Sequence, residues 1–308
     1  RRNAYLRRAS LVEFDGCCSG DAIVIREKQE KVVPGFLTFI LNSNNLWEYA
    51  ISNAAGTMSQ RVKWRDLAEY EFLLPPKDEQ ARLAELLWAM DEVIESEKNN
   101  QKNLKTAFLA NRENLISESK FTKYQLADLV RKIITYGIVQ PGPEVENGVP
   151  YIQSSDIKDG QIAHRLSKTS KEIASSYIRS QVEPNDLIFS LRGNIGDTAI
   201  VTESFGLTNM ARGVARISLS FDYDVSYIKF ALETYPIIGK ILSVSQGSTF
   251  KEVSLETLRK VKVPVPKSLD EQKLISAKLK LLVDALKDLQ KQIAQSRALQ
   301  NALINQIF

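Results

Sequence analysis

Apolar residues recur at alternating steps of four and three along two stretches of nearly forty residues each. Such a stripe is typical of a helix that packs along a partner helix. The sequence therefore predicts two long helices, from Asp78 to Ser117 and from Asp270 to Phe308. The apolar seam of the first is Leu83, Leu87, Met90, Ile94, Leu104, Phe108 and Leu115; that of the second is Ile275, Leu279, Leu282, Leu286, Leu289, Ile293, Leu303 and Ile307.

The segments before the two helices repeat one another in order and spacing. Gly56 and Gly247, Leu67 and Leu258, and Pro75 and Pro266 all lie 191 residues apart. The helix starts Asp78-Glu79-Gln80 and Asp270-Glu271-Gln272 lie 192 apart. A period this long, with several elements in each copy, indicates duplicated domains and not a solenoid.

The second copy alternates short strands with turns. In Asp186-Leu187-Ile188-Phe189-Ser190-Leu191, every second residue is a large apolar one on a single face, and residues 213–219 alternate similarly. Glycine and proline separate these runs, as in Pro141-Gly142-Pro143. Apolar residues at helical spacing then predict a helix from Val225 to about Leu242. We therefore expect a mixed α/β domain with a strand-rich middle.

The first copy matches only the later part of the second. Residues 21–25 correspond to the strand at 212–216, and residues 36–51 to the helix that follows it. No segment of the sequence corresponds to residues 121–191, so we expect the first domain to be truncated. The expected organisation is 1–77 (half of a first domain), 78–117 (first long helix), 118–268 (second domain) and 269–308 (second long helix).

Composition narrows the class of protein without naming a partner. The 308 residues suffice for two domains, and the net charge of +4 is compatible with nucleic-acid binding. No apolar run approaches membrane-spanning length and no signal peptide is recognisable, which predicts a cytoplasmic protein with no membrane partner. Cys17 and Cys18 are adjacent, so they cannot form a disulfide framework, and we expect both to be buried thiols in a strand.

The sequence contains few of the groups that catalysis requires. His164 is the single histidine, without neighbours that would complete a metal site, so a surface or structural role is expected. No phosphate-binding glycine loop or methyltransferase cofactor motif is present. Glu118-Ser119-Lys120 has the spacing of some nuclease sites, but its upstream acidic partner is missing. We expect no catalytic residues, no metal and no cofactor.

Several motifs occur in a fixed order: Gly247-Ser248-Thr249-Phe250-Lys251-Glu252-Val253-Ser254-Leu255, then Val263-Pro264-Val265-Pro266 before Asp270-Glu271-Gln272, with the parallel Phe72-Leu73-Leu74-Pro75-Pro76-Lys77-Asp78-Glu79-Gln80. In this ordered combination the chain resembles the specificity (S) subunit of type I restriction-modification enzymes. Residues 150–157 and 186–196 also resemble that family. The resemblance extends over nearly the whole chain, and the truncated first domain departs from the family pattern.

The resemblance implies a fold and a function. The fold would be two α/β (mixed α+β) target-recognition domains joined by two long helices that form an antiparallel coiled coil. Each domain would read one half of a split sequence in double-stranded DNA. The helices would dock methyltransferase (M) subunits, and restriction (R) subunits would join through the complex. The chain itself would be non-catalytic.

Candidate DNA contacts are polar side chains in the turns of the second domain. Arginine, lysine, asparagine, glutamine and serine are the usual donors to phosphates and base edges. Arg192 is the strongest candidate, because a long cation beside glycine can reach a groove without crowding. The full set is Gln153, Ser154, Ser155, Lys158, Arg192, Asn194, Asn209, Arg212, Gln246, Ser248, Thr249 and Lys251.

Two other functional classes compete with DNA recognition. A scaffolding protein would use the coiled coil to hold partners and would have no role on DNA. Duplex binding that falls steeply with ionic strength distinguishes a DNA-binding subunit from such a scaffold. The third alternative is an enzyme with an unrecognised site.

Overall fold

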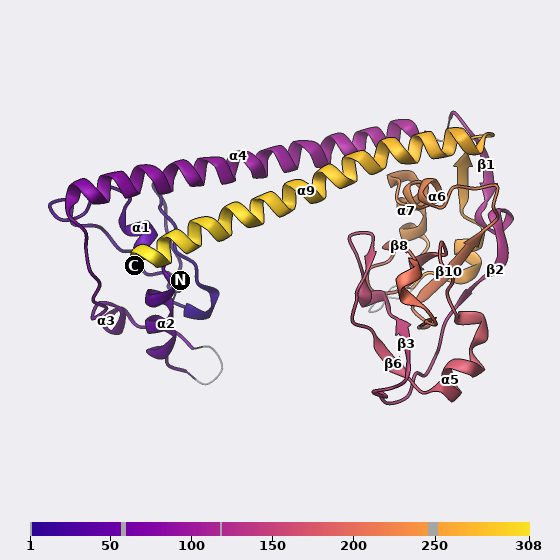
Figure 1. Cartoon of the computed structure of the whole chain (residues 1–308), viewed down its shortest axis with the longest axis horizontal. Coiled ribbons are helices and arrows are strands. Elements are labelled where there is room, and N and C mark those ends of the chain that lie inside the picture. Colours follow the sequence, from indigo (N-terminus) through magenta and orange to yellow (C-terminus); the bar gives the residue numbers. More distant parts are fainter. Residues whose placement is uncertain (1, 57–59, 118, 246–251) are drawn as a thin grey trace. The chain divides into compact units, whose positions relative to one another are not determined.

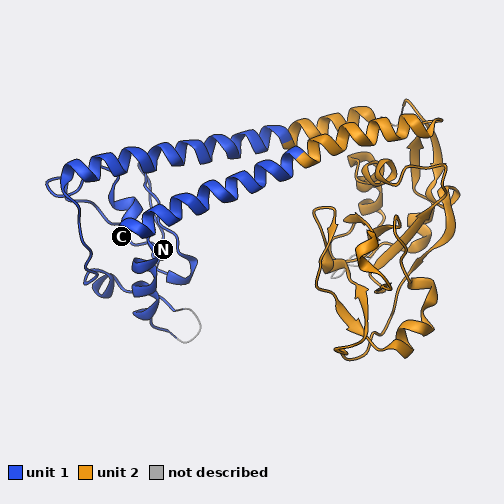
Figure 2. Ribbon diagram, in the orientation of Figure 1, with its two compact units in different colours: residues 1–104, 285–308 blue, residues 105–284 orange. Residues whose placement is uncertain are grey.

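The computed structural model describes residues 2–56, 60–117, 119–245 and 252–308 (Figure 1). The chain divides into two compact units (Figure 2). Unit 1 contains residues 1–104 and 285–308, and unit 2 contains residues 105–284. No helix within the described residues combines the length and the apolar character that a membrane span needs.

Two helices of 39 residues contribute to both units. They are α4 (Lys77–Leu115) and α9 (Leu269–Ile307), whose bounds lie within two residues of those predicted. Acidic residues occupy the first turn of each, where the positive end of the helix dipole favours them. The helices pack together and run antiparallel, as the contacts within each unit show.

In unit 1, polar contacts fix how α4 and α9 are aligned. Gln300 is buried, and its amide Nε2 donates to Leu87 O at 3.3 Å and to Asp91 Oδ1 at 2.9 Å. One turn away, the Ser296 hydroxyl donates to Glu97 Oε1 at 3.2 Å. From Gln300 back to Ser296 along α9, the contacted residue in α4 shifts forward from Leu87 and Asp91 to Glu97, so the two helices are antiparallel. Buried polar side chains in such a seam favour one register over the others.

In unit 2, the other ends of the helices enter the main hydrophobic core. Leu279 is fully buried there and Ile275 nearly so, and Leu115 and Phe108 of α4 pack against the same cluster. Residues 108–115 of α4 and 275–279 of α9 thus share one core, as an antiparallel order of the two helices requires. Every apolar seam residue predicted from the sequence is buried or partly buried in its own unit.

Unit 1 is mostly helical and irregular. Its short elements are η1 (Ala4–Leu6), α1 (Leu37–Ile40), α2 (Asn44–Ser52) and α3 (Trp64–Leu67). One cluster packs Phe36, Phe39 and Ile40 against Leu87 of α4 and Ile304 of α9. Gly35 has a φ of +81°, and a Cβ there would lie 2.9 Å from Trp88 Cζ2, so this close approach requires glycine.

Unit 2 is an α/β domain built on a four-stranded antiparallel sheet in the order β2-β10-β7-β8. A three-stranded sheet, β6-β3-β9, lies in the same unit, and β3 and β9 are parallel. The strands are β1 (Thr122–Gln125), β2 (Val130–Tyr136), β3 (Val149–Ile152), β4 (Ile157–Lys158), β5 (Gln161–Ile162), β6 (Ser167–Thr169), β7 (Leu187–Ser190), β8 (Thr198–Ile200), β9 (Asn209–Met210), β10 (Val214–Leu219) and β11 (Lys262–Val265).

The helices of unit 2 are short apart from the ends of α4 and α9. They are α5 (Lys171–Ser176), α6 (Val225–Leu232), α7 (Tyr235–Ser243) and α8 (Leu255–Arg259), with single-turn η2 (Leu126–Leu129), η3 (Ser154–Asp156), η4 (Ile178–Ser180) and η5 (Glu203–Phe205). Side-chain oxygens of Ser170, Asp224 and Ser254 cap α5, α6 and α8 by accepting from backbone N–H groups of the first turn.

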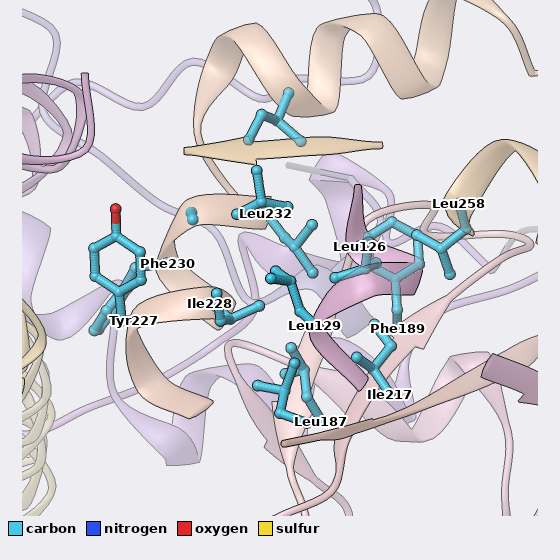
Figure 3. Close-up of a cluster of buried hydrophobic side chains, with 14 of the residues drawn as sticks. Leu126, Leu129, Leu187, Phe189, Ile217, Tyr227, Ile228, Phe230, Leu232 and Leu258 are labelled. Carbon is cyan, nitrogen blue, oxygen red and sulfur yellow. The ribbon is translucent and has the colours of Figure 1, made fainter. Parts of the chain in front are cut away.

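The central strand β7 is buried on both faces. Successive side chains of a strand point to opposite sides, so Leu187 and Phe189 enter one core and Ile188 enters the other. The first core brings helix α6 and residues such as Leu129, Ile217 and Leu258 together (Figure 3). The strand therefore carries its C-terminal end, and Arg192 beyond it, on a rigid support.

A buried glutamine at the start of each long helix holds the helix to its own unit. Gln80 Oε1 accepts the backbone N–H of Val33 at 2.9 Å, and its Nε2 donates to Pro75 O at 2.7 Å. Gln272 Oε1 accepts the N–H of Asp224 at 2.9 Å, and its Nε2 donates to Pro266 O at 3.3 Å. These are the two helix-start glutamines, and both are 1% exposed. The third residue of the repeated Asp-Glu-Gln motif thus has a structural role.

The secondary structure repeats with the spacing of the sequence motifs. Helix α2 lies 191 residues before α7, α3 begins 191 before α8, and α4 lies 192 before α9. The single helix predicted over residues 225–242 is wrong: α6 and α7 are separate, and the chain turns at Glu233 and Thr234. Pro236 favours this break, because its missing N–H is tolerated only in a first turn. Unit 1 breaks at the equivalent place, between α1 and α2.

Two predicted features of the first copy are also wrong. Residues 21–25 form no strand, although their equivalents in unit 2 extend into β10. In unit 2 that strand pairs with β7 and β2, and the described residues of unit 1 contain no counterpart of these partners. Cys17 and Cys18 were predicted to be buried in a strand, but both are exposed and lie in no strand.

Candidate nucleic-acid interface

Several strand ends of unit 2 meet where the candidate residues lie. Strands β3 and β9 are parallel, so their C-terminal ends, Ile152 and Met210, are neighbours. The backbone N–H of Ala211 donates to Ile152 O, and the N–H of Leu191 donates to Gly213 O, both at 2.8 Å. The segments that follow β3, β7 and β9 are therefore joined by backbone hydrogen bonds into one surface.

Arg192 lies just beyond β7 on this surface and is paired with an acid. Its Nη2 lies 2.5 Å from Glu252 Oε2, and the two residues also form an antiparallel backbone bridge. The arginine side chain is 42% exposed and the glutamate side chain 35%. The hydrogen bond to Glu252 raises the pKa of Arg192 above its ordinary value, so the guanidinium stays charged.

Gly213 leaves room for two of the candidate side chains. A Cβ at this position would lie 2.7 Å from Ser154 Oγ and 3.7 Å from Arg192 Cβ. The Ser154 hydroxyl donates to Gly213 O at 2.8 Å, which fixes the turn after β3 against the segment before β10. Arg192 and Ser154 thus both lie beside Gly213.

The turn after β3 is stabilised by its own side chains. Asp156 Oδ2 accepts the backbone N–H of Gln153 at 2.8 Å in a capping box, and Gln153 Nε2 donates to Ser167 Oγ at 3.3 Å. Burial raises the pKa of Asp156, and the backbone hydrogen bond partly offsets this. Gln153 therefore supports the turn, whereas Ser155 and Lys158 are exposed beside it.

The turn after β7 combines an exposed amide with a half-buried acid. Asn194 is exposed and hydrogen-bonds to Asp197. Burial raises the pKa of Asp197, and the charges of Asp159 and Glu233 raise it further. Arg212, before β10, is exposed as well. Exposed polar groups suited to phosphates or base edges thus come from three separate turns.

Asn209 does not lie in a loop, and its predicted placement is wrong. It lies in β9, fully buried, and its Nδ2 donates to Ser180 Oγ at 2.8 Å and to Tyr177 O at 3.2 Å. The amide is occupied inside the domain, so Asn209 leaves the set of candidate contacts. Gln246, Ser248, Thr249 and Lys251 lie outside the described residues.

Glu252 is the residue of this surface that sequence reasoning missed. A search for contacts to phosphates and bases selects side chains that donate hydrogen bonds. A glutamate next to a lysine is interpreted instead as an ordinary solvent-exposed charge. The one available signal was its position at the end of the turn that resembles the S subunit family. No group of three or more metal-binding side chains occurs within the described ranges.

Comparison with known proteins identifies the family. The family model for the type I restriction modification DNA specificity domain matches residues 118–296. The specificity subunit of the EcoBI type I restriction enzyme of Escherichia coli is 33% identical over 177 residues, which is 57% of this chain and 37% of that protein. The putative MjaX specificity subunit of Methanocaldococcus jannaschii is 22% identical over 92% of this chain and 69% of its own length.

Solved structures share the fold at low sequence identity. A chain from a type I R-M system, described for its complex assembly and conformational transition, has a TM-score of 0.65 at 19% identity, over 92% of this chain and 73% of that one. The S subunit from M. genitalium has a TM-score of 0.56 at 18% identity, over 91% of this chain and 74% of that one. With the match of the family model over more than half of its length, the chain belongs to the type I restriction-modification DNA specificity family.

Proposed function

We propose that this chain is a sequence-specific DNA-recognition subunit of a type I restriction-modification complex that reads a bipartite target. The observation that carries this proposal is the duplication: two sets of elements repeat at 191 to 192 residues, and each includes the start of one long helix. We assign residues 1–77 and 118–268 to two target-recognition domains, the first one partial. Residues 78–117 and 269–308 are the helices that connect them.

The surface after β3, β7 and β9 is the proposed DNA contact of the second domain. Its exposed members are Ser155, Lys158, Asn194 and Arg212, with Arg192 half-exposed among them. Lysine and arginine bind phosphates, and serine, asparagine and arginine can read base edges. The side chains extend from turns that hydrogen bonds hold in place, so little further ordering is needed on binding.

Selection from a random duplex library, with the chain bound to its methyltransferase subunit, tests this proposal. We expect two separated blocks of preferred bases, since each recognition domain reads one block. Affinity for the selected duplex should fall steeply as the salt concentration rises, because phosphate contacts release counterions. A single block would contradict the bipartite target, and salt-insensitive binding without base preference would support a scaffold instead.

We further propose that the methyltransferase subunit docks on the long helices. Exposed leucines occur on α9 seven residues apart, Leu274 at 57% and Leu281 at 72% exposure, and both lie in unit 2. Seven residues are two helical turns, so the two side chains share one face. An exposed apolar stripe on a helix that already has its seam partner is suited to a further protein subunit.

Methyl transfer should require that subunit and this stripe. The purified chain alone is expected to transfer no labelled methyl group to the selected duplex, and the reconstituted complex is expected to do so. Leu281→Glu should weaken assembly with the methyltransferase in a pull-down by at least about tenfold, because burying a charge in an apolar interface is costly. Leu281→Met, which keeps the apolar surface, is the control. Methylation by the chain alone would refute the non-catalytic role.

A further inference from the structure

The ion pair between Arg192 and Glu252 restricts the orientation of a half-exposed arginine on the proposed DNA surface. The two side chains approach to 2.5 Å, and the backbones are held together as well, because the N–H of Val253 donates to Leu191 O at 3.0 Å. The acid therefore cannot drift away from the arginine without breaking a backbone bridge. The ion pair is therefore supported by the backbone of the domain and does not depend on side-chain contact alone.

The pair leaves most of the guanidinium available. A guanidinium has five N–H donors, and Glu252 engages the one nitrogen Nη2. The arginine stem passes Gly213, whose missing side chain leaves the space that the Cβ and Cδ of Arg192 lie against. Among the described residues, Glu252 is the one hydrogen-bond partner of this guanidinium, so the other edge remains for a bidentate contact to guanine O6 and N7.

We infer that Glu252 is a positioning residue for DNA reading: it orients the guanidinium of Arg192 toward a guanine edge in one half of the target. This inference rests on the proposed function. An unpaired surface arginine samples many rotamers, which it must give up on binding. Glu252 restricts those rotamers before DNA arrives. Its negative charge also repels phosphates, so the same acid lowers binding to unrelated DNA.

The equivalent of Glu252 in unit 1 is not an acid. Position 61 lies 191 residues before Glu252 and is an arginine, whose Nη1 pairs with Asp21 Oδ1 at 3.0 Å. Asp21 is in turn the equivalent of Arg212. The two copies thus carry opposite charges at corresponding places. Loss of Glu252 should consequently affect the base preferences of one block and leave the other block unchanged.

A double-mutant cycle tests this role in the full chain with its methyltransferase subunit. Glu252→Gln, Arg192→Ala and the double variant would be measured against the selected duplex and against duplexes with each base pair of the second-domain block changed. We expect Glu252→Gln to reduce discrimination at one guanine position about five- to tenfold, within the range of a bidentate contact. Binding to unrelated duplex should stay equal or increase. In the Arg192→Ala background, Glu252→Gln should have no further effect on discrimination.

The matched control is Glu256→Gln, a surface carboxylate four residues along that pairs with Lys260 at 2.6 Å and is 75% exposed. It removes the same charge from the same region and should leave discrimination unchanged. An equal loss on every duplex, or an equal loss in the Arg192→Ala background, would assign Glu252 a merely structural role and overturn the inference. Unchanged discrimination would overturn it too. Failure of the wild-type chain to select any sequence would instead refute the proposed function, and the wild-type selection alone reveals that.

Discussion

Replacing Leu279 with alanine is expected to destabilise unit 2 by about 2 to 5 kcal/mol, because the change leaves a cavity in its main core. Leu279 is fully buried on α9 and packs with residues of the sheet and of α6. Leu281, two residues along the same helix, is 72% exposed, and Leu281→Ala should change the free energy of unfolding by less than about 0.5 kcal/mol. The pair of variants isolates packing from helix propensity.

Chemical denaturation of the full chain measures this difference. Far-ultraviolet circular dichroism follows the helices, and tryptophan fluorescence reports on unit 1, which contains Trp47, Trp64 and Trp88. The transition seen by circular dichroism should shift to lower denaturant for Leu279→Ala and stay in place for Leu281→Ala. Equal shifts for the two variants would show that α9 does not pack on the core through Leu279.

Replacing Asp186 with alanine is expected to cost about 3 to 5 kcal/mol, the usual effect of removing one partner of a buried charged network. Asp186 is fully buried, accepts the N–H of Glu183 at 2.8 Å and the Ser218 hydroxyl at 2.5 Å, and lies 4.0 Å from Arg216 Nε. Arg216 is itself buried and would lose its nearest carboxylate. Because Asp186 immediately precedes β7, the change also loosens the strand that supports Arg192.

Asp222→Ala is the control for this prediction. Asp222 is exposed, and its carboxylate accepts a hydrogen bond from the nearby Ser220 hydroxyl. Its removal should change the free energy of unfolding by less than about 0.5 kcal/mol. If Asp186→Ala proved as mild as Asp222→Ala in the same denaturation experiment, the buried network would not hold β7 and β10 together. Asp186→Asn, which keeps the side-chain shape, should fall between the two.

The long helices were predictable because their pattern is local. The spacing of apolar residues such as Leu87 and Leu279 can be recognised without knowing the rest of the fold. The repeat then supports the same prediction for both helices. The break near Thr234 was missed because apolar spacing continues through it, although Pro236 was a visible signal. A strand at 21–25 was predicted by its equivalence to 212–216, and equivalence says nothing about whether a sheet partner is present.

The candidate site was predictable only in outline. Turns with polar side chains can be read from sequence, but the placement of Arg192 and Ser154 on either side of Gly213 cannot. Asn209 was misplaced because a buried asparagine that donates to carbonyls looks like a loop residue when its partners are unknown. Glu252 was missed because its partner, Arg192, lies 60 residues away. Pairings between distant segments depend on the fold, which no local pattern encodes.

The helix-start glutamines have a consequence for how such domains diverge. Within the described residues, the side-chain hydrogen bonds of Gln80 and Gln272 all go to main-chain atoms. These are the N–H groups of Val33 and Asp224 and the carbonyls of Lys31, Pro75 and Pro266. A contact with the main chain is indifferent to the side chains of the segment it binds. Side-chain substitutions in the segments that these glutamines bind can therefore accumulate without loosening the attachment of either helix start.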